Sequence, residues 1–585
     1  MGVKRETGSW MAARFFFCSV FLWIWAAIAQ EAPDGPEAAS GWQEQAQAVG
    51  RHAMVVTANA YATDAALEIL ALGGNAIDAA IAAQFVLNLV EPQSSGIGGG
   101  GFLLHFDARS RRLSAFDGRE TAPAGARPER FLGTDGAAID WSDALASGRA
   151  IGVPGLVAML ALAHERHGHL RWQRLLRPAL HLAEAGFVVS PRLHHLLQVD
   201  GSLRGDEQAR RLYYQEDGSA LPVGARLSNP RFALTLRQLS EQGPRAFYQG
   251  DIAHAIVAAI AARPGAPADL SMGDLAAYRP RERQAVCRRY RSYRVCGMPP
   301  PSSAGVTVAQ LLGLLERTPF ARQASLSPLA VHYFAEAGRL AYADRGRYLA
   351  DPGFVDVPVQ ALLAAPYLEA RSRLIEPGRS MGVALPGEIS GVKRGDSAAQ
   401  ARPGTTHLSI VDAQGNAVAL TASIESAFGS RIMVRGFLLN NQLTDFSFLP
   451  SRDGQLLANR VEPGKRPLSS MAPTLVFDRQ GKLYAVLGSA GGTRIINDVA
   501  QTLSAVLDWR MGPAAALALP HYGSRNGPTE LERGRAPAEL TEALRALGHR
   551  VELQTMNSGI HLIVRGESAW LGAADPRREG SARGN

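Results

Sequence analysis

The stretch PGTTHLSIVDAQGNAVALTASIESAFGS, residues 403–430, has a glycine followed directly by two threonines at the start of an apolar segment. Two runs rich in Val, Ile, Thr and Ala flank residues 413–415. This pattern predicts two strands joined by a turn. Gly404 and Thr405 allow two interpretations. Either they form an ordinary strand start, since Thr favours strands, or the chain is cut between them and Thr405 becomes a new N-terminus.

The segment before this point is compatible with cleavage. Residues 390–404, SGVKRGDSAAQARPG, are polar, contain Gly and Pro, and lack an apolar period. Such a composition predicts an exposed, loosely held segment, and proteolytic processing concentrates in segments of this kind. The composition permits a cut before Thr405 without deciding between the two interpretations.

The composition is that of a globular protein. Of 585 residues, 46% are hydrophobic, and 61 Lys and Arg stand against 53 Asp and Glu, which gives a net charge of +8. The basic residues are spread along the chain in short runs, and no basic tract is interleaved with aromatic residues. A nucleic-acid-binding surface is therefore unsupported, and the charges are better explained as solvated faces.

The N-terminus has the pattern of an export signal. Lys4, Arg5 and Arg14 precede the apolar run FFFCSVFLWIWAAIA, and AIA before Gln30 is a small-x-small cleavage site. The run is short for a membrane span, although an uncleaved anchor remains the alternative. The sequence predicts a signal peptide at 1–29, a flexible leader at 30–50, and a periplasmic or secreted protein with no stable membrane anchor.

Two cysteines remain after the signal peptide, and they lie in a symmetric segment. VCRRYRSYRVC alternates like a hairpin around Arg291 and Ser292, so that Cys287 and Cys296 face each other if the loop has two residues. An oxidising compartment permits a disulfide at this position. Cys and His are not arranged anywhere with metal-ligand spacing, so no metal site is predicted.

Helical patterns dominate the N-terminal two thirds. TDAALEILALGG predicts a helix with Thr63 as N-cap and Gly73 as its end, and a second helix is expected from Asn75 to before Pro92. FLLHFD and RLSAFDGRE read as a hairpin that ends near Arg119. Residues 150–390 are mostly helical in pattern.

The pattern changes after residue 405. GFLLNNQL, PTLVFD and LYAVLG are strand candidates, and GTRIINDVAQTLSAVLDW reads as a helix. Composition and pattern alone therefore predict a mixed α and β protein.

Six motifs in order give the chain a resemblance to a known family: GGNAIDAA, GIGGGGF, DGRETAP, GTTHLSIVD, NNQLTDF, and KRPLSSMAPT followed by GSAGGTRI. From about Ala53 to Gly580 the sequence resembles the γ-glutamyltranspeptidases, N-terminal-nucleophile hydrolases made as proenzymes. The resemblance implies an α+β fold, the αββα sandwich of two stacked antiparallel sheets flanked by helices. It also implies autocleavage at Gly404-Thr405 into a large subunit, 51–404, and a small subunit, 405–585, that form a heterodimer.

The chemistry of an N-terminal threonine explains why cleavage is needed. A threonine hydroxyl is a poor nucleophile without an adjacent base. A free α-amine has a pKa of about 7.7–8, so an appreciable fraction is neutral near neutral pH. Cleavage would therefore give Thr405 a base on its own backbone, and the same hydroxyl could first attack the carbonyl of Gly404. Thr406 would point to the opposite face of the strand.

The resemblance assigns substrate contacts to residues in three motifs. Arg119 would bind the substrate α-carboxylate, where a bidentate guanidinium suits the geometry, and Ser469 and Ser470 would share it. Asp445 would hold the α-ammonium. Taken alone, each has an ordinary alternative as a surface charge, a turn or a cap.

Further residues would complete the site. Gln442 and Glu425 are expected on the ammonium side, and Glu425 stands where some members have Asn. Ser423 replaces a Thr found in many members and keeps a hydroxyl that can bond the Thr405 oxygen. Gly491 and Gly492 match the oxyanion hole, where glycines allow two N–H groups to converge on one oxygen.

The implied reaction is transfer of a γ-glutamyl group from glutathione or another γ-glutamyl amide, through a γ-glutamyl-threonine ester, to water or an amine acceptor. It requires no metal or organic cofactor. A glutaryl or cephalosporin acylase on the same scaffold is the nearest alternative, and a non-catalytic solute-binding relative is an alternative of another class. The sequence leaves open the balance of hydrolysis and transpeptidation, the acceptor, and whether residues 446–468 form a lid.

Overall fold

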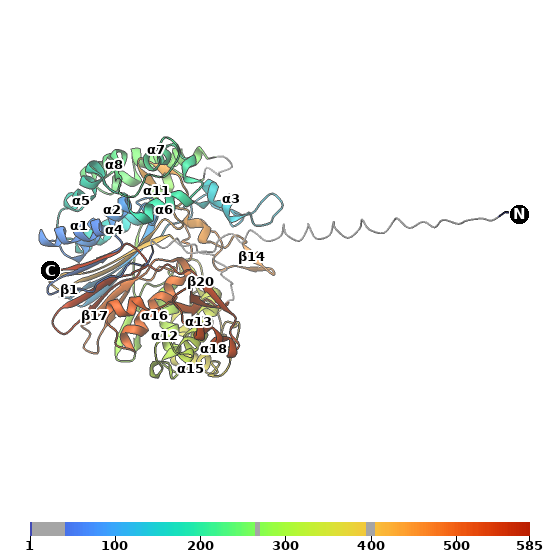
Figure 1. The fold of residues 1–585 in the computed structure, drawn as a ribbon. Helices are drawn as coiled ribbons and strands as arrows, with labels where there is room; N and C mark the ends of the chain where they lie inside the picture. Colours follow the sequence, from blue (N-terminus) through green and yellow to red (C-terminus); the bar gives the residue numbers. More distant parts are fainter. Residues whose placement is uncertain (3–40, 264–268, 393–403) are drawn as a thin grey trace. The chain divides into compact units, whose positions relative to one another are not determined.

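The computed structural model of the protein describes residues 1–2, 41–263, 269–392 and 404–585 (Figure 1). By internal contacts the chain divides at residue 35, and the account below concerns the unit from Pro36 to Asn585. The predicted signal peptide and most of the predicted leader lie outside the described residues. So does most of the polar segment at 390–404.

The strand that begins with Thr405 lies in the middle of a sheet. Within the described residues this sheet has seven strands, and every neighbouring pair is antiparallel. Their order across the sheet is β23 (Ser581–Gly584), β2 (Met54–Thr57), β10 (Thr405–Val411), β11 (Ala417–Ser423), β3 (Gly100–Asp107), β4 (Arg112–Gly118) and β7 (Arg281–Arg283).

A second antiparallel sheet stacks on the first and also has seven strands in the described part of the chain. Its order is β1 (Ala48–Gly50), β22 (Trp570–Ala574), β21 (His561–Arg565), β17 (Leu483–Gly488), β16 (Thr474–Phe477), β9 (Tyr293–Gly297) and β8 (Val286–Tyr290).

Apolar side chains from both sheets fill the space between them. Phe102 and Val411 from the first sheet and Leu475 and Ile563 from the second belong to one buried cluster. The outer face of the first sheet is covered by α1 (Ala60–Ala71), α2 (Ala76–Val90), α4 (Leu156–His167), α5 (Trp172–Ala185) and α8 (Pro230–Gln242). The outer face of the second is covered by α12 (Ala304–Leu315), α13 (Pro328–Tyr348) and α16 (Ile495–Leu507). This four-layer arrangement (Figure 1) confirms the predicted αββα sandwich.

The remaining described helices are short. They are α3 (Trp141–Ala146), α6 (Pro191–Val199), α7 (Glu207–Tyr213), α9 (Arg245–Tyr248), α10 (Asp251–Ala261), α11 (Met272–Ala277), α14 (Val359–Leu362), α15 (Ala365–Ser372), α17 (Pro513–Ala518), α18 (Ala538–Ala546), and the 3₁₀ turns η1 (Gly148–Ala150), η2 (Leu203–Gly205), η3 (Phe320–Arg322), η4 (Gln442–Asp445) and η5 (Gly492–Arg494). Small sheets are formed by β5 (Phe187–Val188) with β6 (Arg226–Leu227), and by β18 (Tyr522–Ser524), β19 (Thr529–Glu532) and β20 (Val551–Gln554).

The hairpin predicted at the opening stretch is confirmed. β10 and β11 pair with Thr405 opposite Ser423 and Val411 opposite Ala417. All residues of both strands are buried, because the other sheet covers one face and helices cover the other. The turn is held by Asp412, whose side chain accepts from the backbone N–H of Gln414 at 3.0 Å.

The first two helices are found where they are predicted, with one error in capping. Asn59, and not Thr63, caps α1, and its side chain accepts from the N–H of Tyr61. Thr63 lies inside the helix, where its hydroxyl bonds backbone and side-chain oxygens nearby. Gly73 follows the helix with φ of +85°, the left-handed conformation of a C-terminal stop. Asn75 caps α2 as predicted.

The strand predicted from GFLLNNQL is mostly wrong. Only β13 (Phe437–Leu438) is a strand, paired with β12 (Met433–Val434). Leu439 adds an isolated bridge to Gly98, and the following residues lead into η4. The segment that follows contains the hairpin β14 (Ser451–Arg452) and β15 (Gln455–Leu456). Phe446 is buried, and Phe448 stacks on Phe131 at 4.3 Å between ring centroids, so both rings pack beside the pocket described below and do not line it.

The cysteine hairpin has the predicted register. β8 and β9 pair with Cys287 opposite Cys296, and a disulfide joins the two residues. The two-residue loop contains Arg291, whose φ of +54° matches the positive values that tight hairpin turns require.

In the described residues, every helix is either too short or too polar to span a bilayer.

Candidate active site

Thr405 opens β10 at the buried end of the first sheet, with 4% of its surface exposed. Its hydroxyl donates to Ser423 Oγ at 3.4 Å across the strand pair. Ser423 Oγ in turn accepts from the backbone N–H of Glu425 at 2.8 Å and donates to the carbonyl oxygen of Gly404. The two hydroxyls therefore form a hydrogen-bonded chain from the threonine to the carbonyl of the peptide bond before it.

Position 404 requires glycine for packing reasons. A Cβ built there would lie 2.1 Å from the carbonyl oxygen of Glu425, a distance that no real contact allows. The bare glycine noted in the sequence thus lets two backbone segments approach closely just before Thr405.

One pocket gathers nearly all of the predicted site residues from six separate stretches of the chain. It is lined by Arg119, Thr405, Ser423, Glu425, Gln442, Asp445, Ser469, Ser470, Met471, Gly492 and Ile495. Gly491 precedes Gly492 in the turn between β17 and α16, and Gly404 precedes Thr405. The structure therefore brings these residues together as predicted, while their roles stay predictions.

Arg119 and Asp445 are in direct contact, which the sequence did not indicate. Arg119 Nη2 donates to Asp445 Oδ2 at 2.5 Å, and both residues are at least 98% buried. Arg119 is fixed by the carbonyls of Pro467 and Leu468 at 3.1 and 2.9 Å, and Gln442 Nε2 donates to Asp445 Oδ2 at 2.8 Å.

Each partner of this ion pair keeps one polar atom that forms no hydrogen bond with the described residues. Within the part of the chain that the structure describes, Arg119 Nη1 and Asp445 Oδ1 are buried and have no hydrogen-bond partner. Buried polar atoms in proteins are almost always hydrogen-bonded. A donor and an acceptor left open in one pocket indicate a ligand that supplies both a negative and a positive group.

Burial shifts the acidity of the carboxyl groups here. It raises the pKa of Asp445, and the Arg119 guanidinium opposes that rise. Glu120, which lies 3.7 Å from Arg119 Nη1, has its pKa raised by burial to about 8. Glu120 is therefore protonated at neutral pH, and the guanidinium faces one carboxylate instead of two.

Two serines line the pocket on the loop before β16, which is hydrogen-bonded to the loop between β9 and α12. The N–H of Ser469 donates to the carbonyl of Pro301 at 3.0 Å, and the N–H of Ser303 donates to the carbonyl of Ser469 at 2.8 Å. Ser470 Oγ accepts from Arg345 Nη2 at 3.0 Å. Since that oxygen accepts from an arginine, its own proton is available to donate to a ligand oxygen.

Two backbone features in the pocket are strained or glycine-specific. Glu425 has φ of +82°, a conformation rare for a non-glycine residue, and its carboxylate accepts from Asn441 Nδ2. Such strain tends to cluster at functional sites. Gly491 and Gly492 have φ of +129° and +63°, so the turn before α16 depends on residues without a Cβ.

Sequence reasoning missed two buried arginines. Arg345 on α13 reaches Ser470, and Arg578 donates from Nη1 to the carbonyl oxygen of Thr405 at 3.1 Å. Both lie in segments that read as an ordinary helix and a C-terminal tail. Only the pairing of distant segments brings them to the pocket.

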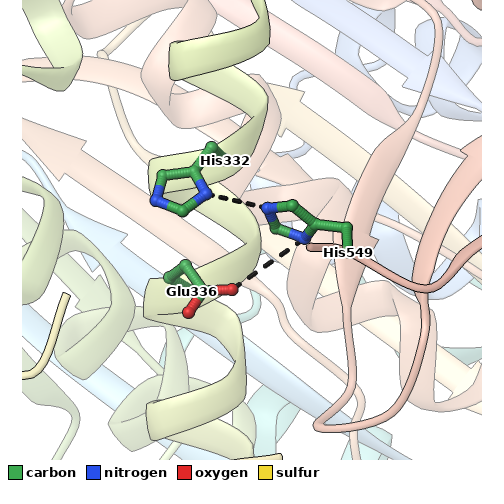
Figure 2. A group of neighbouring side chains, drawn as sticks. All are labelled: His332, Glu336 and His549. Carbon is green, nitrogen blue, oxygen red and sulfur yellow. Dashed lines mark hydrogen bonds and ion pairs between the residues drawn. The ribbon is translucent and has the colours of Figure 1, made fainter. Parts of the chain in front are cut away.

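A cluster of potential metal ligands lies outside this pocket. His332, Glu336 and His549 are fully or almost fully buried, with ligand atoms within 4.8 Å of one another (Figure 2). His332 Nε2 lies 2.8 Å from the carbonyl of Glu376 and donates to it. His332 Nδ1 then accepts from His549 Nε2 at 2.8 Å, and His549 Nδ1 accepts from Thr529 Oγ1 at 2.7 Å.

The two histidines belong to a chain of hydrogen bonds and are not arranged as ligands around one point. His549 turns one nitrogen to His332 and the other toward Glu336, 3.9 Å away (Figure 2), so an ion at either nitrogen would displace the hydrogen bond with His332 or with Thr529. Glu336 already accepts from Arg339 Nε at 3.0 Å, Ser380 Oγ at 2.8 Å and the N–H of Met381 at 2.8 Å. An arginine inside the cluster also opposes a cation.

Removing divalent metal should leave this protein unchanged. Dialysis against EDTA is expected to shift the melting temperature by less than about 1 °C, because the hydrogen bonds of His332, Glu336 and His549 need no ion. Glu336→Gln, by contrast, should lower stability by about 3 kcal/mol, since Arg339 loses its buried partner. Calorimetry with and without added Zn²⁺ checks this prediction. A melting temperature that EDTA lowers and zinc restores would show that the cluster binds a metal ion.

Comparisons with known proteins cover nearly the whole chain. A family model described as Gamma-glutamyltranspeptidase matches residues 62–585. The chain is 37% identical over 563 residues to the glutathione hydrolase proenzyme of Escherichia coli (strain K12), covering 94% of this chain and 95% of that protein. It is 34% identical over 524 residues to the Acylase ACY 1 proenzyme of Pseudomonas sp. (strain SE83), covering 88% and 90%.

The fold also matches a solved structure. The cephalosporin acylase from Bacillus halodurans superposes with a TM-score of 0.78 at 25% identity, covering 93% of this chain and 97% of that one. The similar proteins thus include both glutathione hydrolase and acylase proenzymes.

Proposed function

This chain belongs to the gamma-glutamyltranspeptidase family, and we propose that it transfers γ-glutamyl groups from glutathione and related amides to water or an acceptor amine. The names of its relatives support the substrate class and the synthesis as a proenzyme. The observation that carries the proposal is the buried Arg119–Asp445 pair beside Thr405, with one open donor and one open acceptor. A γ-glutamyl donor carries an α-carboxylate and an α-ammonium that complement these two atoms.

The proposed maturation is an attack by Thr405 on the peptide bond before it. Thr405 Oγ1 bonds to the carbonyl carbon of Gly404, the C–N bond breaks, and the hydroxyl proton passes to the nitrogen, which becomes the α-amine. Water then hydrolyses the ester and leaves a carboxylate on Gly404. Ser423 supports this step, because its hydroxyl donates to the Gly404 oxygen, where negative charge develops.

The products of this cleavage are a large subunit, 51–404, and a small subunit, 405–585, after removal of the signal peptide 1–29 and with 30–50 as leader. Both sheets contain strands from each side of Thr405, which supports a heterodimer that stays assembled. The export pattern at the N-terminus supports a periplasmic or secreted location.

In the transfer reaction the Thr405 α-amine would take the hydroxyl proton as Oγ1 attacks the γ-carbonyl carbon. Backbone N–H groups at Gly491 and Gly492 would stabilise the oxyanion. The amide C–N bond then breaks, the leaving amine takes the proton, and a γ-glutamyl ester remains on Thr405. Water or an acceptor amine attacks that ester and restores the hydroxyl. The residues of the chain suffice for every step.

Substrate binding follows from the open atoms of the pocket. Arg119 Nη1, with the hydroxyls of Ser469 and Ser470, would hold the α-carboxylate. Asp445 Oδ1 would accept from the α-ammonium, with Gln442 and Glu425 on the same side. Charge-assisted hydrogen bonds of this kind are roughly twice as strong as neutral ones.

An acylase that prefers glutaryl or cephalosporin side chains is the second candidate, because relatives of that name match over most of the chain. A glutaryl group lacks the α-ammonium and would leave Asp445 Oδ1 unsatisfied. Turnover of γ-glutamyl and glutaryl anilides by one purified preparation decides between the two. A preference for the glutaryl anilide would overturn the γ-glutamyl assignment. A preparation that stays uncleaved and turns over neither anilide would instead favour the non-catalytic solute-binding relative.

The raised pKa of Glu120 gives the reaction an expected pH dependence. Below a pH of about 8 this carboxyl is neutral, and above it a second negative charge lies 3.7 Å from Arg119 Nη1. The KM of a γ-glutamyl anilide is therefore expected to rise roughly tenfold between pH 7 and 9.5, since the new charge repels the α-carboxylate. Glu120→Gln should remove the rise while retaining the pH 7 value. An equal rise in wild type and Glu120→Gln would assign it to another group.

A further inference from the structure

A second cavity lies outside the pocket that contains Thr405. It has a volume of about 410 Å³, and its lining includes Leu132, Thr134, Ile139, Asp143, Ser147 and Arg149. Sites for small molecules usually have volumes of about 300–1,000 Å³. The cavity is therefore large enough for a small ligand, and none of its residues has a role in the proposed reaction.

One wall of the cavity is a short hairpin at residues 131–139. Leu132 and Ala138 form an antiparallel bridge, and the N–H of Ile139 donates to the carbonyl of Phe131 at 2.9 Å. Leu132 and Ile139 both line the cavity. The hairpin therefore contributes apolar side chains from a hydrogen-bonded frame.

Arg149, on η1, contributes a positive charge that backbone groups hold in place. Its Nη1 donates to the carbonyls of Arg130 and Leu132, both at 3.2 Å, and its own N–H donates to Ser147 Oγ at 3.3 Å. Within the described ranges, Nε and Nη2 of Arg149 make no hydrogen bond. A guanidinium that is already positioned loses little freedom when it binds an anion.

Asp143 contributes the opposite charge to the same cavity. It lies in the first turn of α3 and is exposed. Its carboxylate makes no hydrogen bond or ion pair with the part of the chain that the structure describes, and in particular it is not paired with Arg149. The cavity thus presents an anion and a cation that stay apart, together with apolar side chains.

We propose that this cavity binds a zwitterionic small molecule, a free α-amino acid or a dipeptide with an apolar side chain. Arg149 binds its carboxylate, Asp143 binds its ammonium, and Leu132 and Ile139 contact its side chain. Charge-assisted hydrogen bonds of this kind are roughly twice as strong as neutral ones. This binding does not depend on the proposed function, because neither cleavage nor transfer is needed for it.

The η4 segment packs between this cavity and the pocket of Thr405. Residues of α3 and of the hairpin belong to the same buried cluster as Leu443 and Phe446. Gln442 and Asp445, from the same segment, line the pocket of Thr405. An amino acid in the cavity is therefore a second ligand beside the donor and does not occupy the place of the donor.

The test is equilibrium dialysis of radiolabelled L-leucine against the purified wild-type protein, without any donor. A Kd on the order of 1 mM is expected, because both charges are open to solvent and partly screened. Asp143→Asn and Arg149→Gln should each weaken binding by at least about tenfold. Asp140→Asn is the matched control. Asp140 is an exposed carboxylate just before α3 that does not line the cavity, so its loss should change the Kd by less than about twofold.

Two analogues test the two charges of the ligand separately. Leucinamide lacks the carboxylate and N-acetyl-leucine lacks the ammonium. Each should compete with the label at least about tenfold less well than leucine does. Equal competition by all three compounds would mean that the cavity reads only the apolar side chain, and the zwitterion proposal would fail.

Further variants keep the proposal open to refutation. Arg149→Lys retains the charge and should bind within about fivefold of wild type, which covers the case in which Arg149→Gln loosens the hairpin. Binding that is lost in Asp445→Asn and retained in Asp143→Asn would place leucine in the donor pocket and overturn the proposal. So would the absence of saturable binding to the wild type up to about 20 mM leucine. Cleavage before Thr405 and γ-glutamyl turnover are measured apart from this binding, so the two proposals fail independently.

Discussion

Thr405→Ala is expected to remain a single uncleaved chain and to lose at least about 10⁴-fold in γ-glutamyl turnover. Alanine lacks the oxygen that would attack Gly404 and later carry the acyl group, so both reactions fail together. The rest of the pocket should persist, because the hydroxyl of Thr405 makes only a long 3.4 Å hydrogen bond to Ser423. A denaturing gel and N-terminal sequencing provide the measurement, with the wild-type small chain beginning Thr-Thr-His.

Two conservative variants control for this result. Thr405→Ser keeps a hydroxyl in place and should still be cleaved. In the wild type the Thr406 hydroxyl donates to Glu91 at 3.0 Å on the opposite face of the strand. Thr406→Ser keeps this hydroxyl and should also mature normally. Efficient cleavage of Thr405→Ala itself would mean that another group or a protease cuts the chain, and self-processing would have to be abandoned.

Asp445→Asn is expected to cut kcat/KM for γ-glutamyl anilide by hundreds- to thousands-fold while cleavage before Thr405 continues. The substitution keeps the shape and removes the charge that would balance the substrate α-ammonium, at a cost of about 3–5 kcal/mol for a buried charge left unpaired. Glutaryl donors lack the ammonium but keep the carboxylate that Arg119 would bind. Their turnover should fall less than about tenfold, and Arg119 freed from its partner could raise it.

Asp344→Asn is the matched control for this variant. Asp344 is a buried carboxylate that pairs with Arg371 at 3.1 Å, outside the pocket. Its loss should affect both donors equally, through stability alone. If Asp445→Asn likewise lowers both donors by one common factor, Asp445 is structural, and the argument for an amino-bearing substrate loses its main support.

The local signals in the sequence were sufficient for several individual elements, whereas the two-sheet sandwich followed from the family resemblance. The hairpin around 413–415, the caps at Asn75 and Gly73, and the cysteine hairpin depend on short-range chemistry, and each is found in the structure. Thr63 failed as a cap because Asn59, four residues earlier, already supplies the capping oxygen. GFLLNNQL failed as a long strand because its polar half turns into the pocket.

The contents of the pocket followed from the family resemblance, but the contacts inside it did not. Arg119 and Asp445 were expected to hold opposite ends of a substrate, and the structure also pairs them with each other across 326 positions of sequence. Arg578 gave no signal at all. It contacts Thr405 because the C-terminal tail returns to the start of β10, 173 positions earlier in the sequence, and residue patterns do not encode such distant approaches.

The order of strands in the two sheets has a consequence for the lifetime of the enzyme. β10 and β11 lie between β2 and β3 in the first sheet, and the strands from β22 to β16 lie between β1 and β9 in the second, so strands from either side of residue 404 are interleaved in both sheets. Before cleavage, the covalent connection keeps the effective concentration of the two halves high during folding. The proposed cleavage would remove that connection, and recovery from unfolding would become a bimolecular search by two interdigitating chains. The cleaved protein would then be protected by the slowness of its unfolding rather than by its ability to refold, which is kinetic rather than thermodynamic persistence.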